Sequence, residues 1–206
     1  MQDDAARVAA RLFDDRRAQP IEEGVLQTLV RFGVGALSYA LALGIRVVLL
    51  RHGERYRDAS SALTRLGIDV DAWPAPPAGL FVVEERSLYV RSRSPMTVAH
   101  EFGHALDCAL GGGVYRSGID PRVRRFFCDA HAFVTPYAAT GIDEYFAESL
   151  RAYVGVNDAS SPWPRATRER LRRIDPKMHD YVRAIFTDEF TTRALAICDR
   201  ERRQSA

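Results

Sequence analysis

Hydrophobic and polar positions along the chain predict a small set of helices and strands. Residues 7–17 are rich in charge and residues 20–43 are longer and more apolar, and both segments are predicted to be helices. Residues 45–50 form a short, mainly apolar run with β-branched side chains, which is typical of a central strand. A further helix is predicted over residues 56–66, ended by Gly67.

The middle of the chain has the pattern of a β-hairpin. A proline-rich loop at 71–78 leads into residues 80–83, and the turn Glu84-Glu85-Arg86 separates these from residues 87–91. Further on, a loop is predicted at 159–164 and helices at 168–173 and 179–200. Helices, then strands, then helices again indicate an α+β fold. We expect one domain over residues 1–206, made of N-terminal helices at 1–43, a core at 44–155 and C-terminal helices at 156–206.

Residues 94–113 have the features of a well-bounded helix. Ser94 or Thr97 can cap its N-terminus, and three glycines at 111–113 end it. The helix contains His100-Glu101-Phe102-Gly103-His104, a His-Glu-x-x-His motif. Because residues four apart share one helix face, His100 and His104 can bind one zinc ion while Glu101 acts as general base. A glycine in mid-helix would be tolerated if a strand or a substrate passes close by.

A catalytic zinc site needs a third protein ligand. The extended pattern with another histidine six residues after His104 is absent, because Leu110 stands there. His131 is one candidate. Glu144 is the better one, since Glu144 and Glu148 lie four apart in a helical stretch and share a face. Glu144 would then bind zinc and Glu148 would accept the free ring N–H of a ligand histidine; the alternative is that both carboxylates lie on a solvated surface.

The motif and the segment that follows it resemble one family of zinc peptidases. Residues 100–107 and the sequence Glu144-Tyr145-Phe146-Ala147-Glu148 look like parts of the catalytic domain of anthrax lethal factor and of the secreted Pro-Pro endopeptidases. The resemblance covers residues 45–155 and implies a zincin-like fold, with a small mixed β-sheet and its edge strand over the motif helix. It also implies that Glu144 is the third zinc ligand, and that Tyr137 points into the site to stabilise an oxyanion.

The second strand of the hairpin is a candidate for substrate binding. Zinc peptidases commonly bind substrate as an added strand along a sheet edge. Because residues 87–92 directly precede the motif helix, we expect Leu88, Tyr89 and Val90 to form that edge. An interior strand is the alternative, and the sequence does not separate the two.

Composition and charge restrict the partners and the location. The net charge of +2 implies no strong nucleic-acid or membrane partner, so the expected partner is a protein or peptide substrate. The three cysteines are widely spaced and form neither a disulfide framework nor a Cys-x-x-Cys zinc site. No signal peptide is visible, and the uncharged run at 32–45 is too short to span a bilayer of ~30 Å.

Together these features predict a zinc metalloendopeptidase. Without a signal peptide, it would be a bacterial toxin or effector delivered by a leaderless route, or a cytoplasmic enzyme. Two alternatives are a cytosolic regulatory metallopeptidase of the repressor-cleaving type and a catalytically inactive zinc-binding interaction module. Tyr137 favours the first prediction over the regulatory peptidase, and Glu101 argues against the inactive module because a structural zinc site needs no base.

Overall fold

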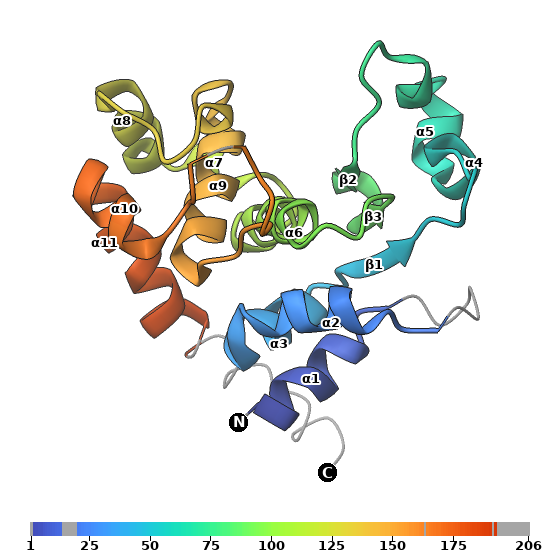
Figure 1. Ribbon diagram of the computed structural model, residues 1–206, viewed down its shortest axis with the longest axis horizontal. Helices are drawn as coiled ribbons and strands as arrows, with labels where there is room; N and C mark the ends of the chain where they lie inside the picture. The colour runs from blue at the N-terminus through green and yellow to red at the C-terminus, as the bar shows by residue number, and fades with distance from the viewer. Residues whose placement is uncertain (1, 14–19, 163, 191, 193–206) are drawn as a thin grey trace.

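The computed structural model describes residues 2–13, 20–162, 164–190 and 192, which form a mostly helical molecule around a small sheet (Figure 1). This arrangement confirms the α+β class expected from the sequence. The elements are, in order, α1 (Gln2–Ala10), α2 (Glu23–Val30), α3 (Gly33–Ala42), β1 (Arg46–Leu49), α4 (Tyr56–Ala59), α5 (Ser61–Leu66), η2 (Val70–Ala72), β2 (Gly79–Val82), η3 (Val83–Glu85), β3 (Ser87–Val90), α6 (Pro95–Leu110), α7 (Arg116–Ile119), α8 (Pro121–Asp129), η4 (Tyr137–Ala139), α9 (Ile142–Val154), α10 (Arg168–Ile174), α11 (Pro176–Ala184) and η5 (Ile185–Glu189).

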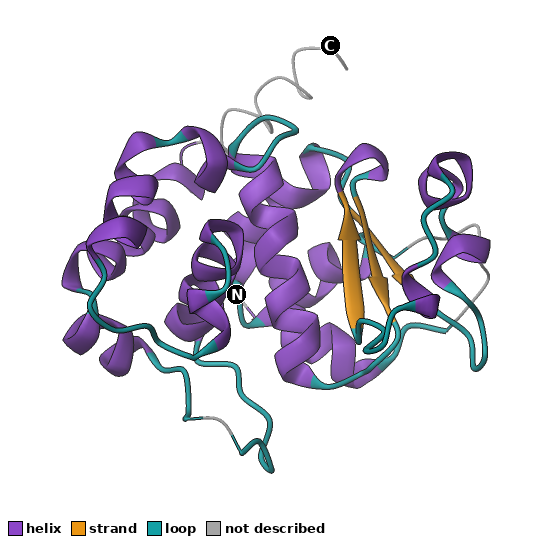
Figure 2. Ribbon diagram, turned by 90° about the horizontal axis from the view of Figure 1, so that it is seen from above, coloured by secondary structure: helices purple, strands orange, loops and turns teal. Residues whose placement is uncertain are grey.

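The three strands form one mixed sheet in the order β1-β3-β2. β3 runs parallel to β1, where Val47 pairs with Leu88, and antiparallel to β2, where Phe81 pairs with Leu88. The predicted hairpin is therefore confirmed, with β2 and β3 as its strands and η3 in the turn. Figure 2 shows the sheet standing beside α6, with helices on both sides of it.

Both faces of the sheet are buried, because side chains alternate along each strand between two hydrophobic clusters. Val47, Leu49 and Leu88 belong to the larger cluster, which includes the buried side chains of α6 and α9. Val48 and Tyr89 belong to the smaller one, which includes buried side chains of α4 and α5. Burial on two sides explains why residues 45–50 are apolar almost throughout.

The expectation that residues 87–92 form the substrate-binding edge is wrong. Leu88, Tyr89 and Val90 lie in β3, which is paired on both sides and buried. The parallel pairing with β1 puts β3 in the middle, and β2 is the edge strand that approaches α6. Gly79 of β2 comes so close to α6 that a Cβ atom there would lie 2.6 Å from Glu101 Cγ.

The apolar segment predicted as one helix over residues 20–43 is two helices, α2 and α3. They meet at a bend of 106°, and Gly33 starts α3 with a φ of +80°. At the bend, Phe32 packs edge-to-face on Phe102 of α6, with ring centroids 4.9 Å apart. Among the described residues, no single helix has both the length and the apolar character to cross a bilayer. Counted together, the bent pair α2 and α3 is long and apolar enough.

The terminal helices differ from their predicted ranges. α1 ends at Ala10, and residues 14–17 of the predicted first helix lie outside the described residues. The predicted helix at 179–200 is represented by the end of α11 and the π-helical turn η5, and its residues 193–200 also lie outside the described part. α10 and α11 both pack against α9, and thereby support the segment that carries Glu144 and Glu148 (Figure 1).

Candidate metal centre

The motif helix α6 begins at a doubly capped N-terminus. Ser94 Oγ accepts a hydrogen bond from the Thr97 N–H at 3.3 Å. The carboxylate of Asp158, in the loop after α9, accepts hydrogen bonds from the Ser94 hydroxyl and from the Met96 N–H. These caps satisfy N–H groups that the helix itself leaves free. The start of α6 is therefore fixed to the chain that leaves α9.

α9 crosses α6 at Gly103. A Cβ atom added to Gly103 would lie 3.0 Å from both the Cα and the carbonyl oxygen of Ala147, which is closer than ordinary van der Waals contact. The segment that passes this glycine is thus a helix, and neither a strand nor a substrate. Since Glu144 lies one turn before Ala147, the close crossing places its carboxylate over the two histidines of the motif.

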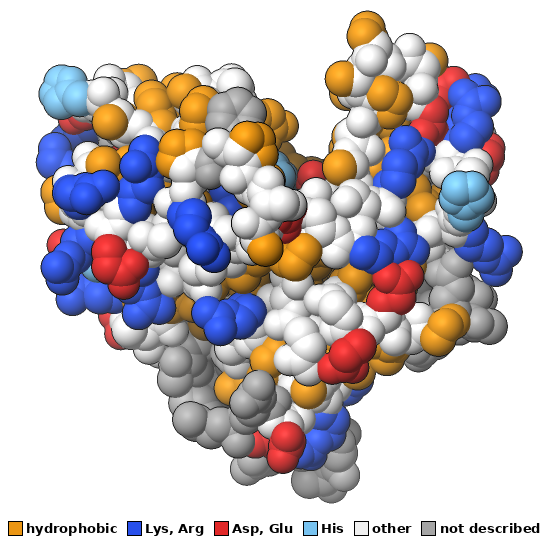
Figure 3. Space-filling model, viewed as in Figure 1, with side chains coloured by type: hydrophobic (Ala, Val, Ile, Leu, Met, Phe, Trp, Pro, Cys, Tyr) orange, Lys and Arg blue, Asp and Glu red, His pale blue; other side chains and the backbone are white. Residues whose placement is uncertain are grey.

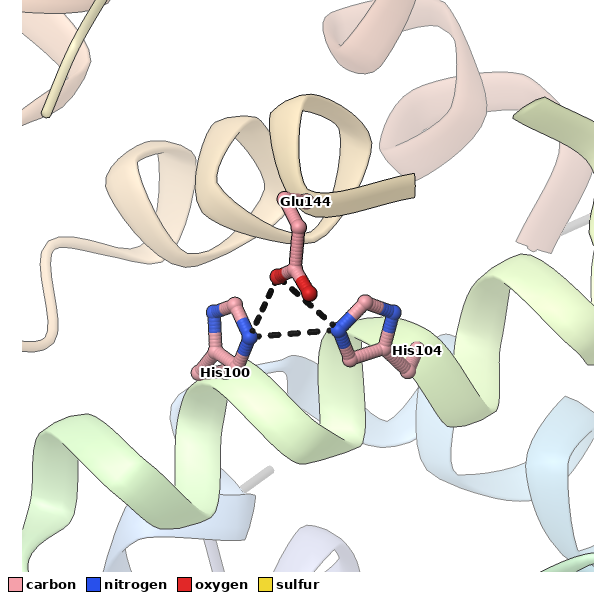
Figure 4. A group of neighbouring side chains, drawn as sticks. All are labelled: His100, His104 and Glu144. Carbon is pink, nitrogen blue, oxygen red and sulfur yellow. Dashed lines mark hydrogen bonds and ion pairs between the residues drawn. The ribbon is translucent and has the colours of Figure 1, made fainter. Parts of the chain in front are cut away.

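His100, His104 and Glu144 converge on one point (Figure 4). The two histidine Nε2 atoms are 3.1 Å apart, and Glu144 Oε2 lies 3.0 Å from His100 Nε2 and 3.3 Å from His104 Nε2. Ligands held at ~2.0–2.1 Å from a tetrahedral zinc ion are about 3.3–3.4 Å apart, so the three atoms need to move little to bind zinc. Apart from its contacts with the two histidine nitrogens, the buried Glu144 Oε2 has no polar partner among the described residues. The donor set and its geometry therefore fit a zinc ion.

The pKa values of these side chains reflect their convergence when no metal is bound. Burial lowers the pKa of His100, but hydrogen bonds with Glu144 and Glu148 outweigh it and raise this pKa to about 10. Burial raises the pKa of Glu144, but hydrogen bonds with His100 and His104 outweigh it and lower this pKa to about 2. At neutral pH the metal-free site thus holds a protonated His100 beside an ionised Glu144.

Glu148 holds the ring of His100 from behind. Glu148 Oε1 lies 2.9 Å from His100 Nδ1, which leaves Nε2 of that ring directed at the cluster. The buried Arg151 donates hydrogen bonds to both carboxylate oxygens of Glu148, from Nε to Oε1 at 2.8 Å and from a terminal nitrogen to Oε2 at 2.7 Å. The Thr135 hydroxyl also donates to Oε2. Burial raises the pKa of Glu148, but hydrogen bonds with His100 and Arg151 outweigh it and hold this pKa well below its usual range.

Glu101 lies between α6 and the edge strand β2. Burial raises the pKa of its carboxyl group, opposed by the charges of the two histidines and by a hydrogen bond with the Phe81 backbone. Gly79 allows β2 to approach, because a side chain at that position would collide with Glu101. A carboxylate with a raised pKa beside a cluster of potential metal ligands is suited to accept a proton.

Tyr137 stands at the rim of the cluster, at the start of η4. Its phenol oxygen is 3.3 Å from Glu144 Oε1, and its ring centroid is 5.3 Å from that of His100. The side chain is half exposed, so its hydroxyl is accessible from the cleft. Burial, together with the nearby charges of Glu144 and Glu101, raises the pKa of Tyr137 to about 12. The phenol therefore keeps its proton, and can donate a hydrogen bond, throughout the neutral range.

A cleft of about 260 Å³ opens beside His100, Glu101 and Tyr137. Figure 3 shows it as a deep notch in this face of the molecule, with histidine and carboxylate atoms at its floor. The lining residues are Pro77, Ala78, Gly79, Met96, Thr97, His100, Glu101, Thr135, Tyr137, Glu148 and Arg151. The lining residues that come from the end of the proline-rich loop and from the start of α6 are uncharged.

Sequence reasoning missed two residues of this site. Arg151 lies one helical turn after Glu148, and this spacing of opposite charges was a signal that could have identified it. Thr135 carries no comparable signal, because its contact with Glu148 depends on the path of the loop after α8. His131, the alternative third ligand, is exposed beyond the end of α8 and does not belong to the cluster.

Comparison with known proteins supports the fold. The chain is similar to the structure of the Pro-Pro endopeptidase PPEP-2 from Paenibacillus alvei, with a TM-score of 0.59 and 18% sequence identity. The match covers 86% of this chain and 99% of the other. By sequence, the chain matches no protein-family model and none of the curated proteins. At this identity the likeness concerns the arrangement of the backbone.

Proposed function

We propose that this protein is a zinc-dependent endopeptidase that hydrolyses peptide bonds in a protein or peptide substrate. The observation that carries the proposal is the convergence of His100 Nε2, His104 Nε2 and Glu144 Oε2, next to an open cleft that His100 and Glu101 line. A bound zinc ion would polarise the scissile carbonyl and make a water molecule more acidic. The fold shared with a Pro-Pro endopeptidase is in keeping with this chemistry.

Glu101 is the general base in this proposal. Its carboxylate lines the cleft and is steadied by the backbone of Phe81, so it can take a proton from the attacking water and later give it to the leaving amine. In the metal-free protein, burial raises the pKa of the Glu101 carboxyl group. A protonated Glu101 would then be well matched to the transfer to the amine.

Tyr137 is the donor for the developing oxyanion. Its hydroxyl is at the rim of the site, and its raised pKa keeps the proton in place. One well-oriented donor of this kind is worth about 2.7–4 kcal/mol in the transition state, or about 10²–10³ in kcat. His100 is oriented by Glu148, so its Nε2 atom stays directed at the metal position.

The open edge of β2 is the proposed binding strand for the substrate backbone. Ala78 O accepts hydrogen bonds from the N–H groups of Arg91 and Ser92, on the β3 side. Since backbone groups alternate along a strand, those of Gly79 face the opposite side, toward the cleft. A substrate could pair there as an additional strand, in the mode first expected for β3.

One of the two alternatives, an inactive zinc-binding module, has less support. Structural zinc sites are usually closed by four protein ligands. Among the described residues, the cluster has three side chains that could bind a metal, and it adjoins a cleft lined by His100 and the Glu101 carboxylate. This arrangement is the one expected of a catalytic site.

The direct test is cleavage of a diverse peptide library, read by mass spectrometry, with zinc-loaded wild type and Glu101→Gln. We expect cuts by the wild type that are absent with Glu101→Gln, while both proteins keep one equivalent of zinc. Glu84→Gln, the same change on an exposed residue of the η3 turn, is the matched control and should cut like the wild type. Cuts that persist in Glu101→Gln, or no cuts from folded, zinc-loaded wild type, would contradict the proposal.

A further inference from the structure

The carboxylate of Glu148 is the meeting point of three separate segments. From α6 it binds His100 Nδ1 at 2.9 Å, and from its own helix it binds Arg151 through both oxygens. From the loop before η4 it accepts the hydroxyl of Thr135. An ionised carboxylate has about four acceptor positions, and these contacts use all of them. Glu148 is 3% exposed, so no water competes freely for these positions.

Thr135 extends this network to the turn that carries Tyr137. The Thr135 side chain is buried, and its Oγ1 also accepts the N–H of Ala138 at 3.3 Å. This bond ties Thr135 to the second residue of the short turn η4, whose first residue is Tyr137. The Thr135 hydroxyl therefore accepts a hydrogen bond from the turn and donates one to Glu148, which links the turn to that carboxylate.

Tyr137 itself has few contacts that could hold it without Thr135. It is half exposed, and the hydrogen bond that its hydroxyl donates to Glu144 Oε1 is long, at 3.3 Å. The backbone of the turn gains a second bond from the Thr140 hydroxyl to Tyr137 O, at 2.8 Å, but Thr140 is itself exposed. The side chain of Ala138 is buried in the hydrophobic core, and Thr135 is the residue that joins this turn to the Glu148 carboxylate by hydrogen bonds.

We propose that Thr135 is a positioning residue for Tyr137, and that it acts through the Glu148 carboxylate that also orients His100. His100, the proposed metal ligand, and Tyr137, the proposed oxyanion donor, are then both positioned by the Glu148 carboxylate. Arg151, which binds this carboxylate, also donates a hydrogen bond to Val156 O at 2.8 Å. The consequence for catalysis rests on the proposed peptidase function. The positional part does not, because it concerns the geometry of the protein alone.

The positional part is tested by tyrosine ring NMR of zinc-free and zinc-loaded protein. The chain has eight tyrosines, and the ring signals of Tyr137 are those lost in Tyr137→Phe. We expect Thr135→Val, which keeps the shape but removes the hydroxyl, to move or broaden these signals, and Thr135→Ser to restore them. Thr28→Val is the matched control, because the buried Thr28 hydroxyl donates its hydrogen bond within α2, to Gly24 O. Unmoved Tyr137 signals in Thr135→Val would overturn the proposal.

The catalytic part is tested by a double-mutant cycle on any peptide that the wild type cuts. Tyr137→Phe should lower kcat by about 10²–10³, and Thr135→Val by about tenfold through misplacement of the phenol. In the Tyr137→Phe background, Thr135→Val should cost less than about twofold, since the group it positions is gone. Equal losses in both backgrounds would overturn the coupling.

Zinc affinity separates this role from damage to the metal ligands. Arg151 and His100 still hold Glu148 in Thr135→Val, so zinc binding, measured by chelator competition, should stay within about threefold of wild type. A loss of zinc that parallels the loss of kcat would overturn the assignment to Tyr137. If wild type cuts nothing but the Tyr137 signals respond as expected, the peptidase proposal fails and the positioning stands.

Discussion

The crossing of α6 and α9 at Gly103 makes Gly103→Ala the sharpest test of the architecture. In an unobstructed helix interior, this change stabilises a protein by up to about 1 kcal/mol. Here the new Cβ would lie 3.0 Å from two backbone atoms of Ala147 and 3.1 Å from its Cβ. Carbon atoms pack best at about 3.5–4.0 Å, so α9 would have to retreat by about 0.5 Å. Backbone atoms cannot rotate away as a side chain can.

Overpacking of this kind typically costs about 1–3 kcal/mol, which exceeds the gain in helix propensity. We therefore expect Gly103→Ala to lower the free energy of unfolding by about 1 kcal/mol, measured by urea denaturation of the zinc-free protein. Gly24→Ala in α2 is the control, because no atom lies within 4 Å of the added Cβ. That variant should be as stable as wild type or up to about 1 kcal/mol more stable.

The retreat of α9 in Gly103→Ala should also change the geometry of the candidate metal site. Glu144 lies one turn from Ala147, so a shift of α9 moves its carboxylate relative to His100 and His104. Metal–ligand distances tolerate only about ±0.2 Å, and we expect zinc affinity to fall at least tenfold in Gly103→Ala, measured by chelator competition. If Gly103→Ala gains stability like Gly24→Ala and binds zinc normally, the close helix crossing is refuted.

Three further outcomes follow from contacts in the site. Gly79→Ala places a Cβ 2.6 Å from Glu101 Cγ and should lower the rate of peptide cleavage at least tenfold with zinc affinity unchanged; full activity would contradict the close approach of β2. Metal binding requires a neutral imidazole, and the pKa of His100 is raised to about 10, so zinc affinity should increase about tenfold per pH unit between pH 7 and 9. Calorimetry in buffers of different ionisation enthalpy should show that zinc binding releases about one proton. A zinc affinity that is independent of pH would refute the raised pKa of His100. Glu144→Ala should weaken zinc binding more than the about 100-fold typical of losing an outer partner, whereas His131→Ala should leave it unchanged; the reverse result would exchange the two assignments.

Much of the local structure was predictable because its signals lie within a few residues of one another. The helical pitch alone puts His100 and His104 on one face, and Ser94 and the glycine at 111 bound that helix as expected. The β-hairpin follows from two short apolar runs with a three-residue turn between them. In each case, the residues that determine the element are also the residues that form it.

The arrangement of these elements depended on contacts between distant parts of the chain. The strand expected at the edge became the central one because β1, about forty residues earlier, pairs with it, and either position suits the same apolar sequence. Gly33 and the packing of Phe32 on Phe102 divided one predicted helix into two. Local spacing contains no information about such partners.

The candidate site shows the same division. The spacing of Glu144 and Glu148 indicated that they share a helix face, but only the crossing of α9 over α6 at Gly103 brought that face to the histidines. Thr135 joined the site because its loop folds back onto Glu148, which no local pattern predicts. Sequence therefore determined which side chains could take part, since chemistry and helical pitch are local properties. Tertiary structure decided which of them meet, because close packing of helices fixes distances between residues that are far apart in the chain.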